Sequence, residues 1–413
     1  MSAALESREV RTLVQDEEAF SLPAWIYRDP EFFELEKDQV FRPSWQLVCH
    51  ESDIPRPGDY HSFDFLDESI FVVRGDDRQV RSFHNVCRHR ASRLLDESRG
   101  SCGRRITCPY HAWTYALDGR LIAVPNSESF RGFDKAKHGL AKLEQETWKG
   151  FIFVRLVPGG PSVSEMAAPY AEEIAQHRFE ELVPQGRVTL RPRQVNWKNV
   201  ADNYSDGLHI PVAHPGLTRL FGNSYGIEAQ AWIDKMWGEL RDQPSRRWSE
   251  RMYQQLVARC DGQPADAHRR WVYYKFWPNV AFDIYPDQVD FMQFIPVSAN
   301  ETVIREIAYV HRDAQDREGA AGSGQVQVSE RDREHRRHLR LLRYLNWRIN
   351  RRVNIEDKVL IDRVQAGMNS SSYTVGPLSE GEVCLRSFAR RMRNLIPECR
   401  QHTQPARGWS GRC

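Results

Sequence analysis

The sequence predicts an α+β fold with two domains, and three observations lead to this prediction. Between residues 41 and 158, short runs of β-branched and aromatic residues alternate with Gly, Asp and Pro turns, which is typical of a small antiparallel β domain. The Pro- and Gly-rich segment VPGGPS then interrupts this pattern. From residue 159 to 413, helical and strand-like stretches mix, which indicates a larger domain with an antiparallel sheet flanked by helices.

The composition limits the kinds of molecule that we expect the protein to bind. The chain has 413 residues, enough for two to three domains of roughly 150 residues each. Its 58 Lys and Arg and 56 Asp and Glu residues leave a formal net charge of +2, too small for the broad basic field of nonspecific nucleic-acid or membrane-surface binding. No run approaches the ~18–20 apolar residues of a membrane span. We therefore expect a small-molecule partner, no nucleic acid and no membrane.

The N-terminal 40 residues predict one or two short helices, broken at Pro23 and Pro30, that pack on the larger domain. The first residues are acidic and lack the basic start and apolar run of a signal peptide, so we expect a cytoplasmic protein. The eight cysteines are sparse and irregularly spaced, unlike those of a secreted disulfide framework. In a reducing compartment, clustered Cys residues indicate a metal site.

The predicted elements follow from residue patterns along the chain. A helix is expected around Trp197–His209, ahead of the strands of the larger domain. The strand-like runs are WQLVCH (45–50), GDYHSFDF (58–65), SIFVVRG (69–75), QVRSFHNVC (79–87), ITCPYHAWTYAL (106–117) and GFIFVRL (150–156), followed by WVYYKFW (271–277), VAFDIY (280–285) and VDFMQFI (289–295).

A first group of candidate ligands lies in the small domain. Cys87 and His89 form C-x-H, and after eighteen intervening residues Cys108 and His111 form C-x-x-H. A Cys₂His₂ zinc finger would place both Cys in one pair and both His in the other. Two Cys on one iron and two His on the other are instead the ligand set of a Rieske [2Fe-2S] cluster. Packing is the alternative for any one of these residues, but it accounts poorly for all four.

A second group follows in the larger domain as D-x-x-H-x-x-x-x-H, formed by Asp206, His209 and His214. On the expected helix, Asp202, Asp206 and His209 share one face, and Pro211 ends the helix before His214. The two His can therefore converge. Non-haem Fe(II) oxygenases hold iron with two His and one carboxylate and leave positions open for O₂ and substrate.

The missing carboxylate is predicted to be Asp357, in the helical stretch near the C-terminus. A buried carboxylate is unfavourable unless it is paired or bound to a cation. Glu356 and Asp362 have Arg363 and Lys358 within one or two turns, so we expect them to be solvated or ion-paired. The residues three, four, seven and eleven positions after Asp357 are apolar: Leu360, Ile361, Val364 and Met368.

With both groups in place, the chain resembles the catalytic α subunit of the Rieske non-haem iron oxygenases, which include naphthalene dioxygenase and choline monooxygenase. The Rieske pairs, the NWKNVADNY block with its two His, and the EDKVLIDRVQAGM helix occur in the family's order. The resemblance implies a Rieske domain before a helix-grip-like catalytic domain. It also implies that Cys87, His89, Cys108 and His111 hold one [2Fe-2S] cluster per subunit, and that His209, His214 and Asp357 hold one mononuclear Fe(II).

The resemblance further implies a subunit arrangement. In the family, a head-to-tail homotrimer brings one subunit's cluster beside its neighbour's iron, and Asp206 would bridge them by hydrogen bonds to His209 and to His111 of the partner subunit. Electrons would come from NAD(P)H through a separate flavin reductase and possibly a ferredoxin, because the chain lacks a nucleotide-binding glycine motif. A β subunit that completes an α₃β₃ assembly stays open.

The substrate is the least constrained feature. Aromatic residues between 225 and 300 predict an apolar slot for a flat ring or a cage for a quaternary ammonium. Asp206 and Gly207 stand where choline- and betaine-type relatives often have Glu-Cys, so we expect an aromatic or heteroaromatic substrate, as in aromatic hydrocarbon catabolism. The alternative is a monooxygenase that hydroxylates or N-demethylates a choline- or betaine-type compound. The aromatic residues considered are Trp232, Trp237, Tyr273, Tyr274, Phe276, Trp277, Phe282 and Tyr285.

Two other classes of protein compete with an oxygenase. A Rieske electron carrier would explain residues 41–158 but would leave the second ligand group without a role. A Zn-dependent hydrolase could use His209, His214 and Asp357 around an activated water, but it would not need the Cys-His pairs.

Overall fold

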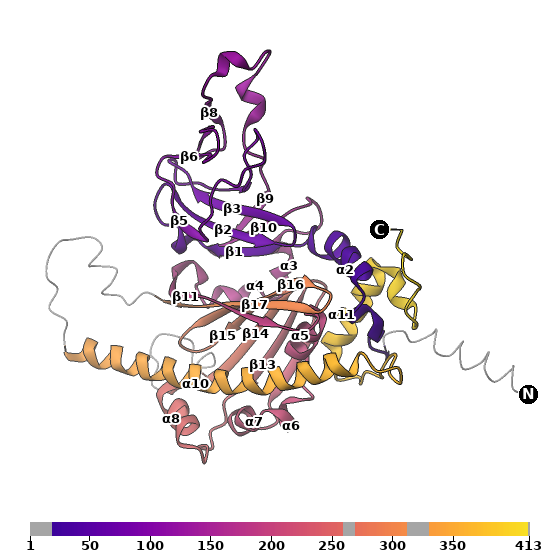
Figure 1. The fold of residues 1–413 in the computed structure, drawn as a ribbon. Helices are drawn as coiled ribbons and strands as arrows, with labels where there is room; N and C mark the ends of the chain where they lie inside the picture. The colour runs from indigo at the N-terminus through magenta and orange to yellow at the C-terminus, as the bar shows by residue number, and fades with distance from the viewer. Residues whose placement is uncertain (1–18, 259–268, 312–329, 412–413) are drawn as a thin grey trace, which may run out of the picture. The chain divides into compact units, whose positions relative to one another are not determined.

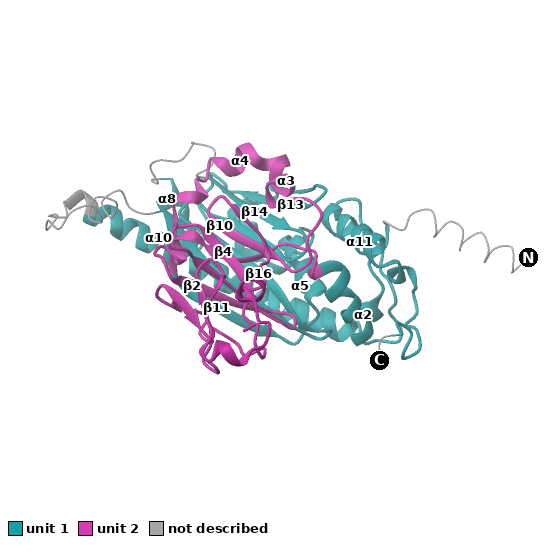
Figure 2. Ribbon diagram, turned by 90° about the horizontal axis from the view of Figure 1, so that it is seen from above, with its two compact units in different colours: residues 1–40, 186–413 teal, residues 41–185 magenta. Residues whose placement is uncertain are grey.

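In the computed structural model, the chain folds into two compact units (Figure 1). Unit 1 comprises residues 1–40 and 186–413, and unit 2 comprises residues 41–185 (Figure 2). The predicted boundary after residue 158 is therefore too early, because the segment up to residue 185 belongs to unit 2. The structure describes residues 19–258, 269–311 and 330–411.

Unit 2 consists of three small antiparallel sheets with strand orders β1-β10-β9, β4-β3-β2-β5 and β6-β7-β8. The run predicted as one strand over 106–117 is split between β6 and β7, because a loop separates them. The strands are β1 (Gln46–His50), β2 (Asp59–Phe65), β3 (Glu68–Arg74), β4 (Val80–His84), β5 (Arg99–Ser101), β6 (Arg105–Thr107), β7 (Thr114–Ala116), β8 (Leu121–Ala123), β9 (Glu144–Trp148) and β10 (Phe151–Arg155). Two short helices follow, α3 (Val163–Ala167) and α4 (Ala171–Ala175).

The core of unit 2 is rich in aromatic side chains. Phe71, Phe83 and Tyr115 are fully buried. Cys87 and Cys108 belong to the same cluster of buried residues. Both cysteines therefore lie in the buried core of unit 2.

Unit 1 is organised around a seven-stranded sheet in the order β11-β17-β16-β15-β14-β13-β12. From β12 to β17 each strand pairs antiparallel with the next one in the chain. The sheet therefore forms by local hairpins, and β11 adds to its far edge. The strands are β11 (Leu182–Arg193), β12 (Tyr225–Ala229), β13 (Ile233–Glu239), β14 (Arg270–Phe276), β15 (Val280–Ile284), β16 (Val289–Ser298) and β17 (Glu301–His311).

Helices cover one face of this sheet, and the long helix α10 runs along it (Figure 1). Leu220 of α7, Tyr253 of α8 and Leu342 of α10 share a buried cluster with Trp271 of β14. A long helix held against an antiparallel sheet is the helix-grip-like arrangement that the resemblance implied. The helices of unit 1 are α2 (Pro30–Glu36), α5 (Trp197–Ser205), α6 (Ile210–Ala213), α7 (Pro215–Phe221), α8 (Trp248–Val257), α10 (Glu330–Gly367) and α11 (Val383–Leu395).

A buried ion pair ties the N-terminal segment to α5. Lys198 Nζ donates to Glu36 Oε1 at 2.7 Å and to the carbonyl of Ile26 at 2.9 Å. Both charged side chains are 0% exposed. Because unpaired buried charges are strongly unfavourable, this contact fixes α5, the helix that leads into the second ligand group. In the described part of the chain, no helix has the length and apolar character needed to cross a bilayer.

Candidate metal centres

The first ligand group lies on two loops with the same backbone design. In each loop the Cys N–H donates to the carbonyl five residues later at 2.8 Å, and the Cys carbonyl accepts from the Ala four residues later at 3.1 Å. Those residues, Ala91 and Ala112, have φ of 56° and 54°. The two matching turns present Cys87 with His89 and Cys108 with His111.

The two imidazole rings of this group lie close together. The centroids of the His89 and His111 rings are 4.6 Å apart, and His89 stacks on Trp113 at 4.8 Å. His89 Nδ1 is buried and has no hydrogen-bond partner among the described residues. An orphaned imidazole nitrogen beside two buried thiols is the donor set that an iron–sulfur cluster needs. The four residues therefore fit a Rieske cluster.

The two thiols have different surroundings. Cys87 Sγ lies 3.3 Å from the Tyr115 hydroxyl, which also accepts from the Arg88 N–H at 3.0 Å. Burial raises the pKa of the Cys87 thiol. Burial also opposes ionisation of Cys108, but backbone hydrogen bonds from Tyr110 and His111 outweigh it and lower the pKa of that thiol. Since thiolates are the metal-binding form, Cys108 is prepared for coordination.

The second ligand group is not on one helix, contrary to the prediction. Helix α5 ends at Ser205, and Asp206 has extended φ and ψ of −87° and 129°. His209 and His214 flank the short helix α6, which Pro211 helps to begin and does not end. The predicted shared helical face of Asp202, Asp206 and His209 is therefore wrong. Asp202 instead accepts from the Tyr27 hydroxyl at 2.8 Å.

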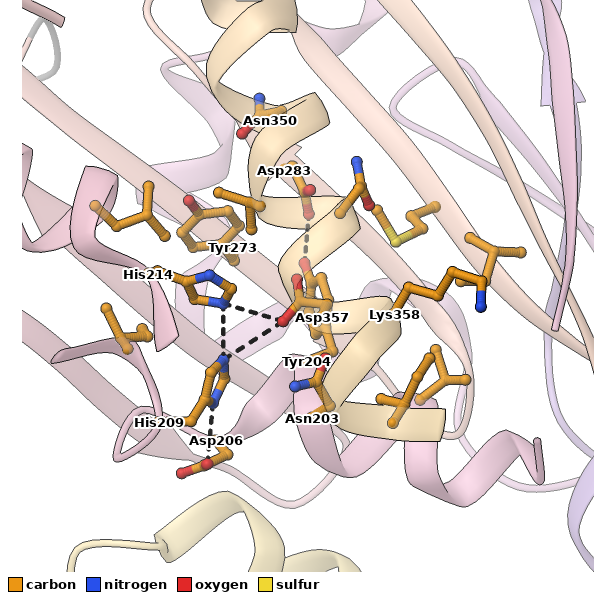
Figure 3. Close-up of a pocket in the computed structure, with 18 of the residues that line it drawn as sticks. Asn203, Tyr204, Asp206, His209, His214, Tyr273, Asp283, Asn350, Asp357 and Lys358 are labelled. Carbon is orange, nitrogen blue, oxygen red and sulfur yellow. Dashed lines mark hydrogen bonds and ion pairs between the residues drawn. The ribbon is translucent and has the colours of Figure 1, made fainter. Parts of the chain in front are cut away.

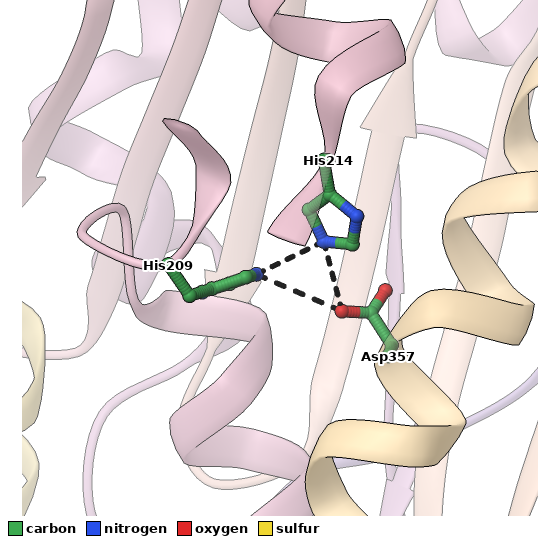
Figure 4. Close-up of side chains that lie close together, drawn as sticks. All are labelled: His209, His214 and Asp357. Atoms are coloured by element: carbon green, nitrogen blue, oxygen red, sulfur yellow. Dashed lines mark hydrogen bonds and ion pairs between the residues drawn. The ribbon is translucent and has the colours of Figure 1, made fainter. Parts of the chain in front are cut away.

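The structure nevertheless brings His209, His214 and Asp357 together (Figure 4). His214 Nε2 lies 3.1 Å from His209 Nε2 and 3.0 Å from Asp357 Oδ1, and His209 Nε2 lies 3.6 Å from that oxygen. Metal–ligand bonds of about 2.1 Å at roughly right angles separate neighbouring donor atoms by about 3.0 Å. The triangle thus has the size that one divalent ion requires, and its donors are those of Fe(II) facial triads.

Asp357 is less buried than we expected from the apolar residues that share its face of the helix. Its side chain is 24% exposed. Ile361 and Met368 are buried, but Val364 is 46% exposed. That face of the helix meets the core only in part, because α10 lies along the surface of the sheet. Asp362 pairs with Lys358 at 2.5 Å, as expected.

A carboxylate contacts the Nδ1 atom of each imidazole and so orients the ring. Asp206 Oδ2 lies 3.0 Å from His209 Nδ1. Glu356 Oε2 lies 2.9 Å from His214 Nδ1 and is also linked to Arg352. Glu356 was not predicted as a site residue, because Arg363 was its expected partner. Ile349 and Val353, two and one turns earlier, would have placed it on the inner face.

These contacts shift the pKa values of the two His and of Asp357. Burial works to lower the pKa of His209, but hydrogen bonds to Asp206 and Asp357 outweigh it and raise that pKa to about 9. Asp357 and Glu356 likewise raise the pKa of His214 against burial. Burial opposes ionisation of Asp357, yet its bonds to the two His lower its pKa. A binding metal must displace protons from the imidazoles, so metal binding weakens as pH falls.

A pocket of about 130 Å³ adjoins the three ligands (Figure 3). Among its acidic lining residues, Asp283 of β15 is directly opposite Asp290 of β16. Asp283 accepts from the Tyr204 hydroxyl and, at 3.4 Å, from the Tyr285 hydroxyl. Burial raises the pKa of Asp283 to about 6, and burial together with the charge of Asp283 raises that of Asp290 well above its usual value.

Only two of the eight aromatic residues considered from the sequence line this pocket, Tyr273 and Tyr285. Side chains alternate along a strand, so neighbours such as Tyr274 point to the other face of the sheet. Trp232 is 37% exposed. The aromatic lining is completed by three residues that were not predicted from the sequence, Tyr204, Tyr225 and Phe294.

Comparisons with known proteins agree with this architecture. Residues 44–142 match the Rieske [2Fe-2S] domain, and residues 179–398 match the ring hydroxylating alpha subunit (catalytic domain). The chain therefore belongs to the family of Rieske ring-hydroxylating oxygenase α subunits.

Two curated relatives are oxygenase subunits of carnitine monooxygenase. The Escherichia coli (strain K12) protein is 38% identical over 204 residues, which cover 49% of this chain and 54% of the relative, so the match spans about half of its length. The Acinetobacter baumannii protein is 32% identical over 293 residues, covering 69% and 74%. A solved quaternary ammonium Rieske monooxygenase with a bound inhibitor has a TM-score of 0.72 at 24% identity, covering 91% of this chain and 95% of its own.

Proposed function

We propose that the protein is the terminal oxygenase of a two- or three-component system and that it hydroxylates a quaternary ammonium compound. The relatives named as carnitine monooxygenase subunits support this substrate class over the aromatic substrate expected from the sequence. The observation that carries the proposal is the pair of opposed carboxylates, Asp283 and Asp290, in a tyrosine-lined pocket beside the iron ligands.

The two opposed acids have neutral hydrogen-bond donors, since Asp283 accepts from Tyr204 and Tyr285 and Asp290 accepts from Gln288, but among the described residues they lack a cation of their own. Like charges directly opposite each other on neighbouring strands destabilise a sheet, and burial together with this repulsion favours the neutral form of Asp290 until a cation binds. Arg191 is the basic residue that acts on both acids, but it is already paired with Glu306. A trimethylammonium group would relieve the repulsion, and the faces of Tyr204, Tyr273 and Tyr285 would attract it. Two acids placed opposite each other are a locally unfavourable arrangement, and such arrangements are characteristic of functional sites.

The proposed reaction balances with one O₂, two electrons and two protons. A C–H bond of the substrate becomes C–OH, and the second oxygen atom leaves as water. When bound, the iron would activate O₂ and the cluster would deliver electrons, while a separate NAD(P)H-dependent flavin reductase, with or without a ferredoxin, would supply them. The chain itself would place the substrate through Asp283, Asp290 and the tyrosines.

The roles proposed for the ligands follow from their chemistry. Cys87, His89, Cys108 and His111 would hold the cluster, and His209, His214 and Asp357 would hold the iron. Asp206 would bridge His209 and His111 of the partner subunit in a homotrimer, with its own side chain 20% exposed and so able to reach a neighbour. We expect a cytoplasmic location.

The first test is a count of metals in anaerobically purified protein. About three irons per chain, with labile sulfide and a Rieske-type EPR signal after dithionite reduction, are expected. A colourless protein that holds zinc would instead support the hydrolase. Light scattering checks the trimer.

The substrate class is tested by binding. Calorimetry should detect choline or L-carnitine, and not naphthalene. Asp290→Asn should weaken cation binding by up to about 3 kcal/mol, or roughly 150-fold, for a charge about 5 Å away at an effective dielectric constant of about 20. Asp242→Asn, at a side chain that is 91% exposed, is the matched control. Tight binding of naphthalene with no binding of either cation would contradict the proposal.

A further inference from the structure

An arginine stands at the opposite end of the same pocket from the two acids. Arg191 of β11 pairs with Glu306 of β17, and the Thr302 hydroxyl donates to the carbonyl of Val195 at 2.8 Å. From the first contact to the second, the residue number rises by four on the β11 side and falls by four on the β17 side. The residues midway between the two contacts, Arg193 and Ile304, therefore lie beside each other. Both residues line the pocket.

The guanidinium of Arg193 has no carboxylate within ion-pair distance in the described part of the chain, whereas its neighbour Arg191 is paired. One nitrogen of Arg193 donates to the carbonyl of Pro192 at 3.1 Å. Its Nε is buried and has no hydrogen-bond partner among the described residues. Burial also lowers its pKa, which reflects the poor solvation of the charge. Arg193, which lines the pocket, thus has guanidinium N–H groups that are available to donate to a ligand.

The register of the sheet gives the spacing between the two charged ends. Ile304 pairs with Phe294, which is four residues from Asp290 along β16. At about 3.4 Å per residue and 4.8 Å per strand, the backbones of Arg193 and Asp290 are roughly 17 Å apart. Both side chains line the pocket, and the long arginine side chain covers part of this span. The remaining gap suits a molecule several bonds long with a charge at each end.

We propose that the substrate is a zwitterion and that Arg193 binds its carboxylate while the quaternary ammonium lies against Asp283, Asp290 and the tyrosines. This inference rests on the proposed function and specifies its substrate. A guanidinium binds a carboxylate through two parallel hydrogen bonds, so it selects that group over a hydroxyl. Lys358 also lines the pocket, but it is paired with Asp362.

The test compares two ligands that differ at one end. Glycine betaine and choline share a trimethylammonium on a two-carbon arm, which ends in a carboxylate or in a hydroxyl, and L-carnitine carries the carboxylate on a longer arm. Calorimetry with the metal-loaded protein should show glycine betaine binding more tightly than choline, and L-carnitine binding at least about tenfold more tightly than choline. Arg193→Gln should weaken L-carnitine binding about 30-fold or more and leave choline binding within about threefold.

Two variants act as controls. Arg193→Lys keeps the charge and should recover part of the affinity for L-carnitine, and Arg187→Gln changes an exposed arginine of the same strand and should alter neither ligand. Retained choline binding in Arg193→Gln also shows that the pocket is folded. Equal binding of choline and L-carnitine, with no selective effect of Arg193→Gln, would overturn the inference but leave the proposed function intact. Failure of both cations to bind, together with binding of naphthalene, would overturn the proposed function itself.

Discussion

The hydrogen bond between Glu356 and His214 offers a direct test of the iron site. Glu356 Oε2 accepts from His214 Nδ1 at 2.9 Å, and the His214 side chain is 2% exposed. This bond fixes which imidazole nitrogen faces the metal. Carboxylates behind a metal-binding His typically contribute 10- to 100-fold in metal affinity, or about 1.4–2.7 kcal/mol. Because this site is buried, we expect Glu356→Leu to weaken Fe(II) binding about 100-fold.

A milder variant separates charge from geometry. Glu356→Gln keeps an oxygen that can accept from His214 but removes the negative charge, so we expect a loss of about tenfold. Anaerobic competition with a chromophoric chelator measures both affinities. Asp362→Asn, on the same helix but 40% exposed and paired with Lys358, should bind Fe(II) like the unchanged protein. Unchanged affinity in Glu356→Leu would refute the role of this carboxylate.

Four further predictions concern single sites. Asp357→Ala should lose the mononuclear iron and turnover but keep the Rieske EPR signal; unchanged turnover would exclude it as a ligand. Asp206→Asn should keep both metals and slow electron transfer to the iron in single-turnover experiments; normal rates would remove its bridging role. Burial lowers the pKa of His50 to about 4, below the unfolded value of about 6.5, so stability should fall as pH drops through this range, by about 2.5 kcal/mol between pH 7.5 and 4.5. Urea unfolding checks this, and His50→Gln should flatten the slope. Lys198→Met should destabilise the protein by about 3–5 kcal/mol because it leaves Glu36 charged and buried, and adding Glu36→Leu should restore much of the loss.

The cluster loops show how far local sequence reaches. Cys87, His89, Cys108 and His111 were predicted from their spacing, and the structure places them on paired turns of one domain. Spacing suffices here because each pair spans only three or four residues, so its geometry is set within a single turn. The matching backbone of the turns, with left-handed Ala91 and Ala112, carries no comparable signal in the residue types.

The proposed iron ligands show where local reasoning stops. Asp357 was predicted from helical periodicity and lies beside His209 and His214, yet the helix expected to carry Asp206 and His209 ends at Ser205. Glu356 was assigned to the wrong partner because its contact with His214 joins residues 142 positions apart. Helical periodicity reports which residues share a face, but it does not report which distant side chain meets that face.

The sequence by itself determined the two-domain α+β architecture and the family, and it indicated two candidate ligand groups, because these depend on residue types at short spacing. Only the tertiary structure decided the chemistry of the pocket. Asp283 and Asp290 become neighbours through strand register, Tyr204 joins them from a helix, and Arg193 arrives from the edge strand. The proposed preference for a cation over a flat ring rests on the electrostatics of these side chains, which lie together only once the sheet has formed.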